Sequence, residues 1–232
     1  MRLCAFAVQI RLCILSNVNS SPQAVIFDFD GTLADTFPAI HAAWNAALEP
    51  ILGRTFTRDE VINRFGPSDE GMLERELADF PFQTLQDAIE VYFRAYEAAH
   101  DQIFAFEGVE ELLQELETRA VPTAVMTGKG RRAADISLRH LGWQGRFPVL
   151  VTGTEILDPK PAPAGPLFAA KQLGFAPQNC LYIGDSPADL GAARAAGMKP
   201  VVAGWHSYFL PQLREMKPEN WANAPLDVLS FL

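Results

Sequence analysis

A pair of aspartates follows the first strongly apolar run of the sequence. Asp28 and Asp30 come directly after residues 23–27, a short run rich in β-branched residues that predicts a buried strand. Because side chains alternate along an extended chain, both carboxylates are expected to face the same cavity. One carboxylate of such a pair can attack phosphorus as a nucleophile, while the other protonates the leaving oxygen and then activates water. Taken alone, the pair fits turn or helix-capping aspartates before Gly31 equally well.

A second pair of acids follows a later apolar run. Asp185 and Asp189 lie in the sequence GDSPADL, which comes directly after the predicted strand at residues 180–183. Parallel strands open into one crevice at their carboxyl ends, so Asp28 and Asp185 can share a hard cation there. Magnesium suits this sparse set of oxygens because it keeps several waters and binds the phosphate oxygens of its substrate. The alternative is that Asp185 or Ser186 only caps the helix that follows.

One hydroxyl and two lysines are candidate contacts for an anion. Thr127 and Gly128 end a predicted strand and begin a helix, so they offer a side-chain hydroxyl and exposed backbone amides. Lys160 stands between two prolines that restrict its loop, which presents its ammonium group with little freedom. Lys129, next to the glycine, is the weaker phosphate candidate. A lone lysine in a loop is ordinarily a solvated surface charge, so Lys160 becomes a candidate only together with the other groups.

Strand-like and helical segments alternate along the chain and predict a doubly wound, Rossmann-like α/β fold. Five short apolar runs are expected to form parallel strands, and helical periodicity fills the connections between them. The expected strands are residues 23–27, 122–126, 148–151, 180–183 and 199–203, and the expected helices include residues 164–173 and 188–196. Residues 35–105 show helical patterns but no convincing strand. They are interpreted as a helical insertion standing over the end of the first strand.

The overall composition excludes several kinds of partner. The chain of 232 residues is 49% hydrophobic and 20% charged, like an ordinary globular protein, and its formal net charge is −9. Its basic residues are scattered, so no nucleic-acid partner is expected. The apolar start of the chain is too short to cross a membrane, and residues 1–22 are expected to form an N-terminal extension. The three cysteines show no metal-ligand spacing and no disulfide framework, which is typical of a cytoplasmic protein.

Four segments, in this order, resemble the four motifs of the haloacid dehalogenase superfamily over roughly residues 24–203. They are DFDGTLADT, the strand that ends in MTG, the KPAP segment and GDSPADL. The resemblance implies that Asp28 is the nucleophile. It implies that Asp30 is the general acid and base, and that the backbone carbonyl of Asp30 binds Mg²⁺. Thr127 and the Gly128 amide would hold the transferring phosphoryl group.

The resemblance also implies roles for the later motifs. Lys160 would neutralise the phosphoryl group and the nucleophile. Asp185 would bind the metal together with Asp28, and Asp189 would support the metal shell or orient Lys160. The core would comprise residues 23–34 and 106–232, with residues 35–105 as a helical cap of the first type.

The function implied is a magnesium-dependent phosphomonoester hydrolase that acts on a small phosphorylated metabolite through an aspartyl-phosphate intermediate. Overall similarity is to the phosphoglycolate phosphatase-like branch. Asp30 disfavours dehalogenases and phosphonate hydrolases, because these lack an acid at that place. A phosphosugar mutase of the same superfamily and a non-enzymatic phosphometabolite-binding protein are the alternatives. The protein is expected to be a monomer or a homodimer.

Arg64 is the candidate for substrate specificity within the insertion. It stands beside a Gly-Pro loop that can lower it toward the site, where its guanidinium can pair with a substrate carboxylate or a second phosphate. The alternative is an ordinary charge on a helix surface.

Overall fold

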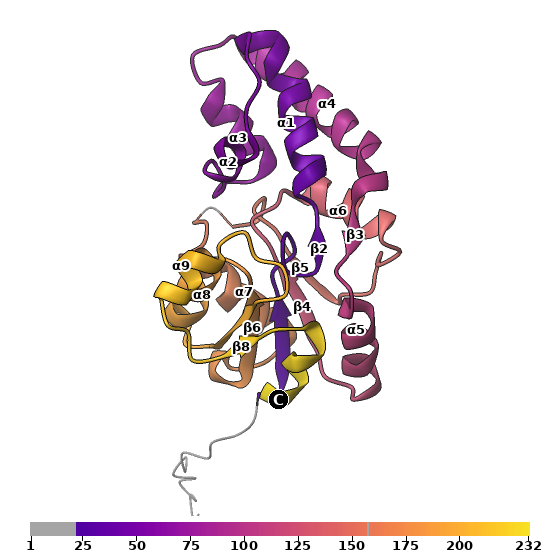
Figure 1. Ribbon diagram of the computed structural model, residues 1–232, viewed down its shortest axis with the longest axis vertical. Helices are drawn as coiled ribbons and strands as arrows, with labels where there is room; N and C mark the ends of the chain where they lie inside the picture. Colours follow the sequence, from indigo (N-terminus) through magenta and orange to yellow (C-terminus); the bar gives the residue numbers. More distant parts are fainter. Residues whose placement is uncertain (1–21, 157) are drawn as a thin grey trace, which may run out of the picture.

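The core of the fold is a parallel sheet of six strands in the order β5-β4-β1-β6-β7-β8 (Figure 1). The structure is a computed structural model that describes residues 22–156 and 158–232. The expected extension, residues 1–22, lies outside the described residues except for Pro22, as do Cys4 and Cys13. The strands are β1 (Ala24–Phe27), β4 (Thr123–Met126), β5 (Val149–Val151), β6 (Cys180–Gly184), β7 (Lys199–Ala203) and β8 (Trp221–Ala222). Because β1 is central, the segments that follow β1, β4 and β6 meet at one edge of the sheet.

The first five of these parallel strands coincide with the predicted apolar runs to within one residue at each end. β8 was not expected, because a strand of two residues is too short to show a periodic pattern. A separate antiparallel pair, β2 (Ala34–Asp35) and β3 (Phe104–Ala105), was also missed. The expectation that residues 35–105 contain no strand is therefore wrong at both ends of that segment.

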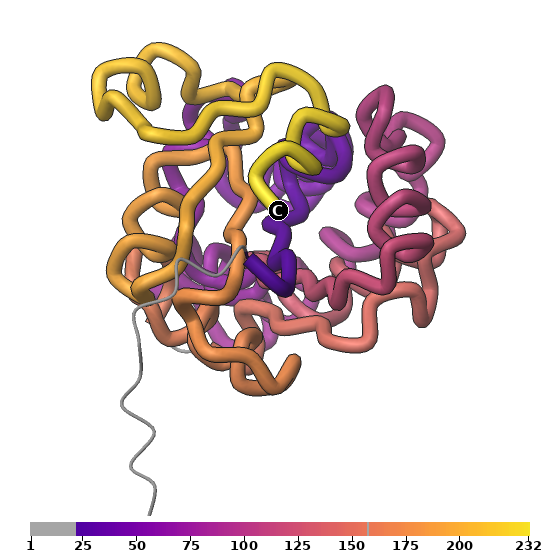
Figure 2. Tube along the Cα trace, turned by 90° about the horizontal axis from the view of Figure 1, so that it is seen from below, coloured from indigo at the N-terminus to yellow at the C-terminus, as the bar shows by residue number. Residues whose placement is uncertain are grey.

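The two faces of the sheet are covered by different helices. Along β1, Ala24 and Ile26 belong to an apolar cluster with α7 and α8, whereas Val25 and Phe27 belong to a cluster with α5 and α6. This alternation is why β1 is apolar at every position: both of its faces are buried. Figure 2 shows the α7–α8 segment and the α5–α6 segment on opposite sides. The core helices are α5 (Val109–Thr118), α6 (Arg131–His140), α7 (Ala164–Leu173), α8 (Pro187–Ala195) and α9 (Leu210–Glu215), with 3₁₀ turns η2 (Pro177–Asn179) and η3 (Pro225–Phe231).

Four helices, called the cap helices below, stand above the carboxyl edge of the sheet (Figure 1). They are α1 (Phe37–Leu52), α2 (Arg58–Ile62), α3 (Asp69–Glu76) and α4 (Phe82–Ala98), followed by the turn η1 (His100–Gln102). α1 and α4 pack along each other and bury Trp44, Phe93 and Tyr96. Within the described part of the chain, no helix combines the length and the apolar character that crossing a bilayer requires.

Candidate active site

The carboxylates of Asp28, Asp185 and Asp189 form a buried cluster where β1 and β6 end. β1 and β6 are neighbours in the sheet, so the segments that follow them start side by side. One oxygen from each carboxylate lies within 4.8 Å of the others. Gly31 has a φ of +82° and lets its loop pass against Asp185, because a Cβ at this position would collide with the Asp185 carboxylate. The fold thus brings together three of the acids that the sequence proposed.

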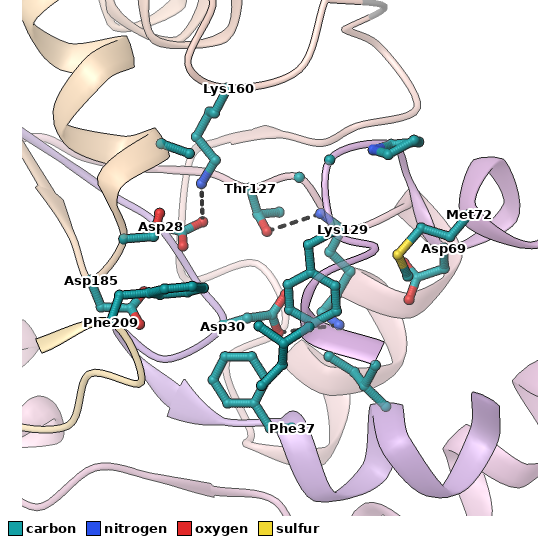
Figure 3. Close-up of a pocket in the computed structure, with 18 of the residues that line it drawn as sticks. Asp28, Asp30, Phe37, Asp69, Met72, Thr127, Lys129, Lys160, Asp185 and Phe209 are labelled. Atoms are coloured by element: carbon teal, nitrogen blue, oxygen red, sulfur yellow. Dashed lines mark hydrogen bonds and ion pairs between the residues drawn. The ribbon is translucent and has the colours of Figure 1, made fainter. Parts of the chain in front are cut away.

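Lys160 reaches this cluster from the loop before α7 (Figure 3). Its Nζ lies 2.8 Å from an Asp28 oxygen and 2.6 Å from an Asp189 oxygen, and 11% of its side chain is exposed. Burial by itself lowers the pKa of Lys160, but the charges of Asp189 and Asp28 outweigh it and hold this pKa well above its ordinary value. Lys160 is therefore a permanent cation placed against the predicted nucleophile.

The acid cluster carries more negative charge than Lys160 can offset. Burial is the main reason that the pKa of Asp28 rises to about 7; the charge of Asp189 adds to this effect and Lys160 opposes it. Burial, followed by the charges of Asp189 and Asp28, also raises the pKa of Asp185 well above its ordinary value. Among the described residues, one oxygen of Asp185, Oδ2, is buried and has no hydrogen-bond partner. An orphaned carboxylate oxygen inside an all-oxygen cluster fits a hard divalent cation.

Asp189 has a second, structural contact. Ser186 caps α8, and its hydroxyl and backbone amide both donate to the Asp189 carboxylate, at 2.5 and 3.1 Å. The capping alternative therefore holds for Ser186 but not for Asp185. Asp189 is fixed from the helix side by this capping box and holds Lys160 with its other oxygen.

The predicted anion contacts line the same cavity as the acids. Thr127 and Gly128 follow β4, the other neighbour of β1. The Thr127 side-chain oxygen accepts a hydrogen bond of 3.1 Å from the Lys129 amide, so the Thr127 hydroxyl proton can be donated to an anion. Figure 3 shows Thr127 beside Asp28 and Lys160.

Lys129 has a role that the sequence did not reveal. Its Nζ lies 3.2 Å from an Asp30 oxygen and donates to the Tyr96 hydroxyl at 3.0 Å, and only 1% of its side chain is exposed. The Thr36 hydroxyl donates to the same Asp30 oxygen. Asp30 is thus held by a buried cation and a hydroxyl on one side of the cavity. The interpretation of Lys129 as a weak phosphate contact overlooked this ion pair, because both Asp30 and Tyr96 are far from Lys129 in the sequence.

Arg64 does not line the cavity. Its Nε donates to Glu76 at 2.8 Å, its Nη1 donates to the Glu60 carbonyl at 2.7 Å, and its guanidinium lies over the ring of Phe56. The structure therefore does not bring Arg64 to the other predicted residues, since an acid and a carbonyl within the cap helices hold its side chain.

The model for haloacid dehalogenase-like hydrolases matches residues 25–203 of the chain. The chain belongs to this family. A phosphoglycolate phosphatase of Xanthomonas campestris pv. campestris (strain 8004) is 36% identical over 213 residues, which cover 88% of this chain and 96% of the relative. The crystal structure of a hydrolase from Pseudomonas syringae is similar with a TM-score of 0.74 and 29% identity, covering 90% of this chain and 96% of that one. A β-phosphoglucomutase from Clostridium difficile has a TM-score of 0.74 at 23% identity, over 88% of this chain and 92% of that one, which shows the fold alone.

These likenesses confirm the predicted family, the fold class and the assignment as an enzyme of the phosphatase type. The roles of the individual residues remain predictions that the geometry supports. Sequence reasoning missed Asp69, which lines the cavity and joins a cap helix to the core. It also missed the aromatic wall formed by Phe37, Phe65 and Phe209. Their sequence signals, a helix-starting acid and isolated aromatic residues, are those of ordinary capping and core positions.

Proposed function

We propose that this chain is a magnesium-dependent phosphomonoester hydrolase that forms an aspartyl-phosphate on Asp28. The observation that carries the proposal is the contact of 2.8 Å between Asp28 and Lys160 inside the buried acid cluster. A carboxylate nucleophile and a phosphate dianion repel each other because both are negatively charged. An adjacent ammonium group offsets this repulsion and lets the carboxylate approach phosphorus. The orphaned oxygen of Asp185 supports a divalent cation at the same place.

Binding of the substrate and the metal uses groups from four segments of the chain. The phosphoryl oxygens are held by the ammonium of Lys160, the hydroxyl of Thr127 and the amide of Gly128. Asp28 and Asp185, with the backbone carbonyl of Asp30, are the residues that would hold Mg²⁺. Once bound, Mg²⁺ neutralises charge on the phosphoryl oxygens.

The reaction proceeds in two displacements. An oxygen of Asp28 attacks phosphorus, the bond between phosphorus and the ester oxygen breaks, and Asp30 gives a proton to that leaving oxygen. Asp30 then takes a proton from a water molecule, whose oxygen attacks phosphorus and releases phosphate from Asp28. The ion pair with Lys129 and the Thr36 hydroxyl orient the Asp30 carboxylate for both transfers.

We also propose that residues 35–105 form a cap domain over a core of residues 23–34 and 106–232. The pair β2–β3 lies where both connections cross between these parts. Side chains from both parts line the cavity, so closure of the cap over bound substrate excludes water from the first displacement.

The substrate in this proposal is a small phosphorylated metabolite, and phosphoglycolate is the first to test because of the names of the relatives. The net charge of −9 supports the absence of a nucleic-acid partner. We further propose that the protein is a cytoplasmic monomer or homodimer with no membrane partner. The described thiol, Cys180, is free and buried, which supports a reducing compartment.

The test measures phosphate release from a panel of phosphomonoesters by the full chain, with and without Mg²⁺. Asp28→Asn should abolish release, and mass spectrometry of acid-quenched wild type should find a phosphoryl group on Asp28. Asp79→Asn, at an exposed aspartate, is the matched control and should keep full activity. Full turnover by Asp28→Asn would overturn the proposal, and an isomerised sugar phosphate without phosphate release would identify a mutase instead.

A further inference from the structure

The active-site cavity has an apolar wall beside the acidic residues, and Figure 3 shows Phe209 next to Asp185. The cavity has a volume of about 300 Å³, which is at the small end for ligand sites. The cap helices and the segments beside them contribute most of this wall, and the loop before α9 contributes one ring. The largest apolar side chains of the lining are Phe37, Ile40, Ile62, Phe65, Met72 and Phe209. Phe37 and Phe65 are stacked, with ring centroids 5.8 Å apart and planes at 11°.

Both cations that line this cavity within the described chain are already neutralised. Lys160 is paired with Asp28 and Asp189, and it is required by the phosphoryl group. Lys129 is paired with Asp30 and is fully buried. No lysine occurs in the sequence between Asp28 and Lys129, so the cap helices have no other ammonium group to offer.

Two arginines of the segment 35–105, Arg58 and Arg64, add no cation to this wall. Arg64 is held by Glu76 and does not line the cavity. Arg58 also does not line it, and its guanidinium lies 5.4 Å from the ring centroids of both Phe37 and Tyr208.

Asp69 adds a negative charge to the apolar side. It is 3% exposed and lines the cavity. Its two oxygens accept hydrogen bonds from the Tyr92 hydroxyl at 2.6 Å and from the Gly130 amide at 2.8 Å, so they are occupied. A carboxylate on the substrate would therefore lose its water, meet no free cation and approach a fixed acid. Each of these effects weakens its binding.

We propose that the preferred substrate carries an uncharged, apolar leaving group, such as a benzyl or branched alkyl alcohol, in place of a carboxylate. This inference rests on the proposed function, because it uses the same phosphoryl site. Apolar area on such a group is buried against the rings of Phe37, Phe65 and Phe209, which favours binding, whereas a carboxylate in the same place is opposed.

The experiment compares three phosphomonoesters that all release a primary alcohol: benzyl phosphate, 2-methylpropyl phosphate and phosphoglycolate. The last two have equal numbers of non-hydrogen atoms, so they differ in charge and polarity but hardly in size. With Mg²⁺, kcat/KM for the two apolar esters should exceed that for phosphoglycolate by about tenfold or more. A higher kcat/KM for phosphoglycolate would overturn the inference and leave the proposed function intact. Failure to hydrolyse all three, and the rest of the metabolite panel, would instead overturn the proposed function.

A charge introduced into the wall provides an independent check. Phe65 is partly exposed and lines the cavity, so Phe65→Arg should reverse the preference by favouring phosphoglycolate over 2-methylpropyl phosphate. Phe82 lies outside the cavity with 72% exposure, and Phe82→Arg is the matched control that should leave the ratio unchanged. Thermal unfolding of both variants verifies that they fold. A folded Phe65→Arg variant with the wild-type ratio would contradict the assignment of this wall to the leaving group.

Discussion

Replacing Lys129 with methionine tests the buried ion pair between Lys129 and Asp30 at the active-site cavity. Methionine keeps the length and most of the volume of the side chain but removes its charge. Burial lowers the pKa of Lys129, yet Asp30 and its neighbours outweigh this and raise it above the ordinary value, so the native side chain is an ammonium ion at every working pH. The substitution leaves the Asp30 carboxylate with the hydroxyl of Thr36 and without its cation.

The expected loss of stability follows from the burial of the pair. Removing one partner of a buried salt bridge costs about 3–5 kcal/mol, because the other charge is left uncompensated. The Asp30 side chain is 17% exposed, so the lower end, about 3 kcal/mol, applies. The Tyr96 hydroxyl keeps its contact of 2.8 Å with Ser137, so its lost bond to Lys129 adds little.

Urea unfolding of the metal-free protein measures this loss. In a chain of this length, 3 kcal/mol corresponds to a fall in Tm of about 6–12 °C. The variant Lys171→Met, at an exposed lysine in α7, is the control and should change stability by less than about 0.5 kcal/mol. Combining Lys129→Met with Asp30→Asn should recover part of the loss, since the double variant removes both charges. A loss below about 1 kcal/mol for Lys129→Met, with an unchanged m-value, would refute the reasoning.

Three further predictions concern charge at the site. First, burial raises the pKa of Asp28 from 3.8 to about 7, so in the metal-free protein the folded chain retains a proton that the unfolded chain has released. The free energy of unfolding of wild type, relative to that of Asp28→Asn, should therefore fall as the pH rises from about 4 to about 7 and stay constant above about pH 7. Urea unfolding in the presence of a chelator measures this difference. Second, Mg²⁺ should raise the Tm of wild type in thermal scans and should raise the Tm of Asp185→Asn much less, because the variant lacks one of the carboxylates that would bind the metal. Equal increases in Tm would argue against the proposed metal site. Third, Arg64→Ala should leave KM for every active substrate unchanged while lowering Tm, because Arg64 is bound to Glu76; a large rise in KM would restore Arg64 as a specificity residue.

The candidate active site was accessible from the sequence because its signals are local. Each of Asp28, Thr127 and Asp185 comes directly after, or one residue after, a short apolar run, and a parallel sheet places the ends of such runs together. The order of the four motifs then identified the family. Lys160 was recognised through its motif, and its contact with Asp28 depended on the path of a long loop.

The specificity side of the site was not accessible in the same way. Arg64 was expected to contact the substrate, but the sequence does not show which group its guanidinium pairs with. In the structure it pairs with Glu76, twelve residues later, within the cap helices. The strand β8 is two residues long and is recognisable only by its pairing with β7.

The sequence by itself determined the fold class, the family and the clustered acids of the candidate site, because short-range hydrophobic patterns and compact motifs encode them. The tertiary structure alone decided that Lys129 is a buried partner of Asp30, that Arg64 lies outside the cavity and that aromatic side chains line the cavity. These features arise from contacts between side chains that are distant in the chain, such as Lys129 with Tyr96. Burial and charge pairing depend on such contacts, and no local pattern of residues records them.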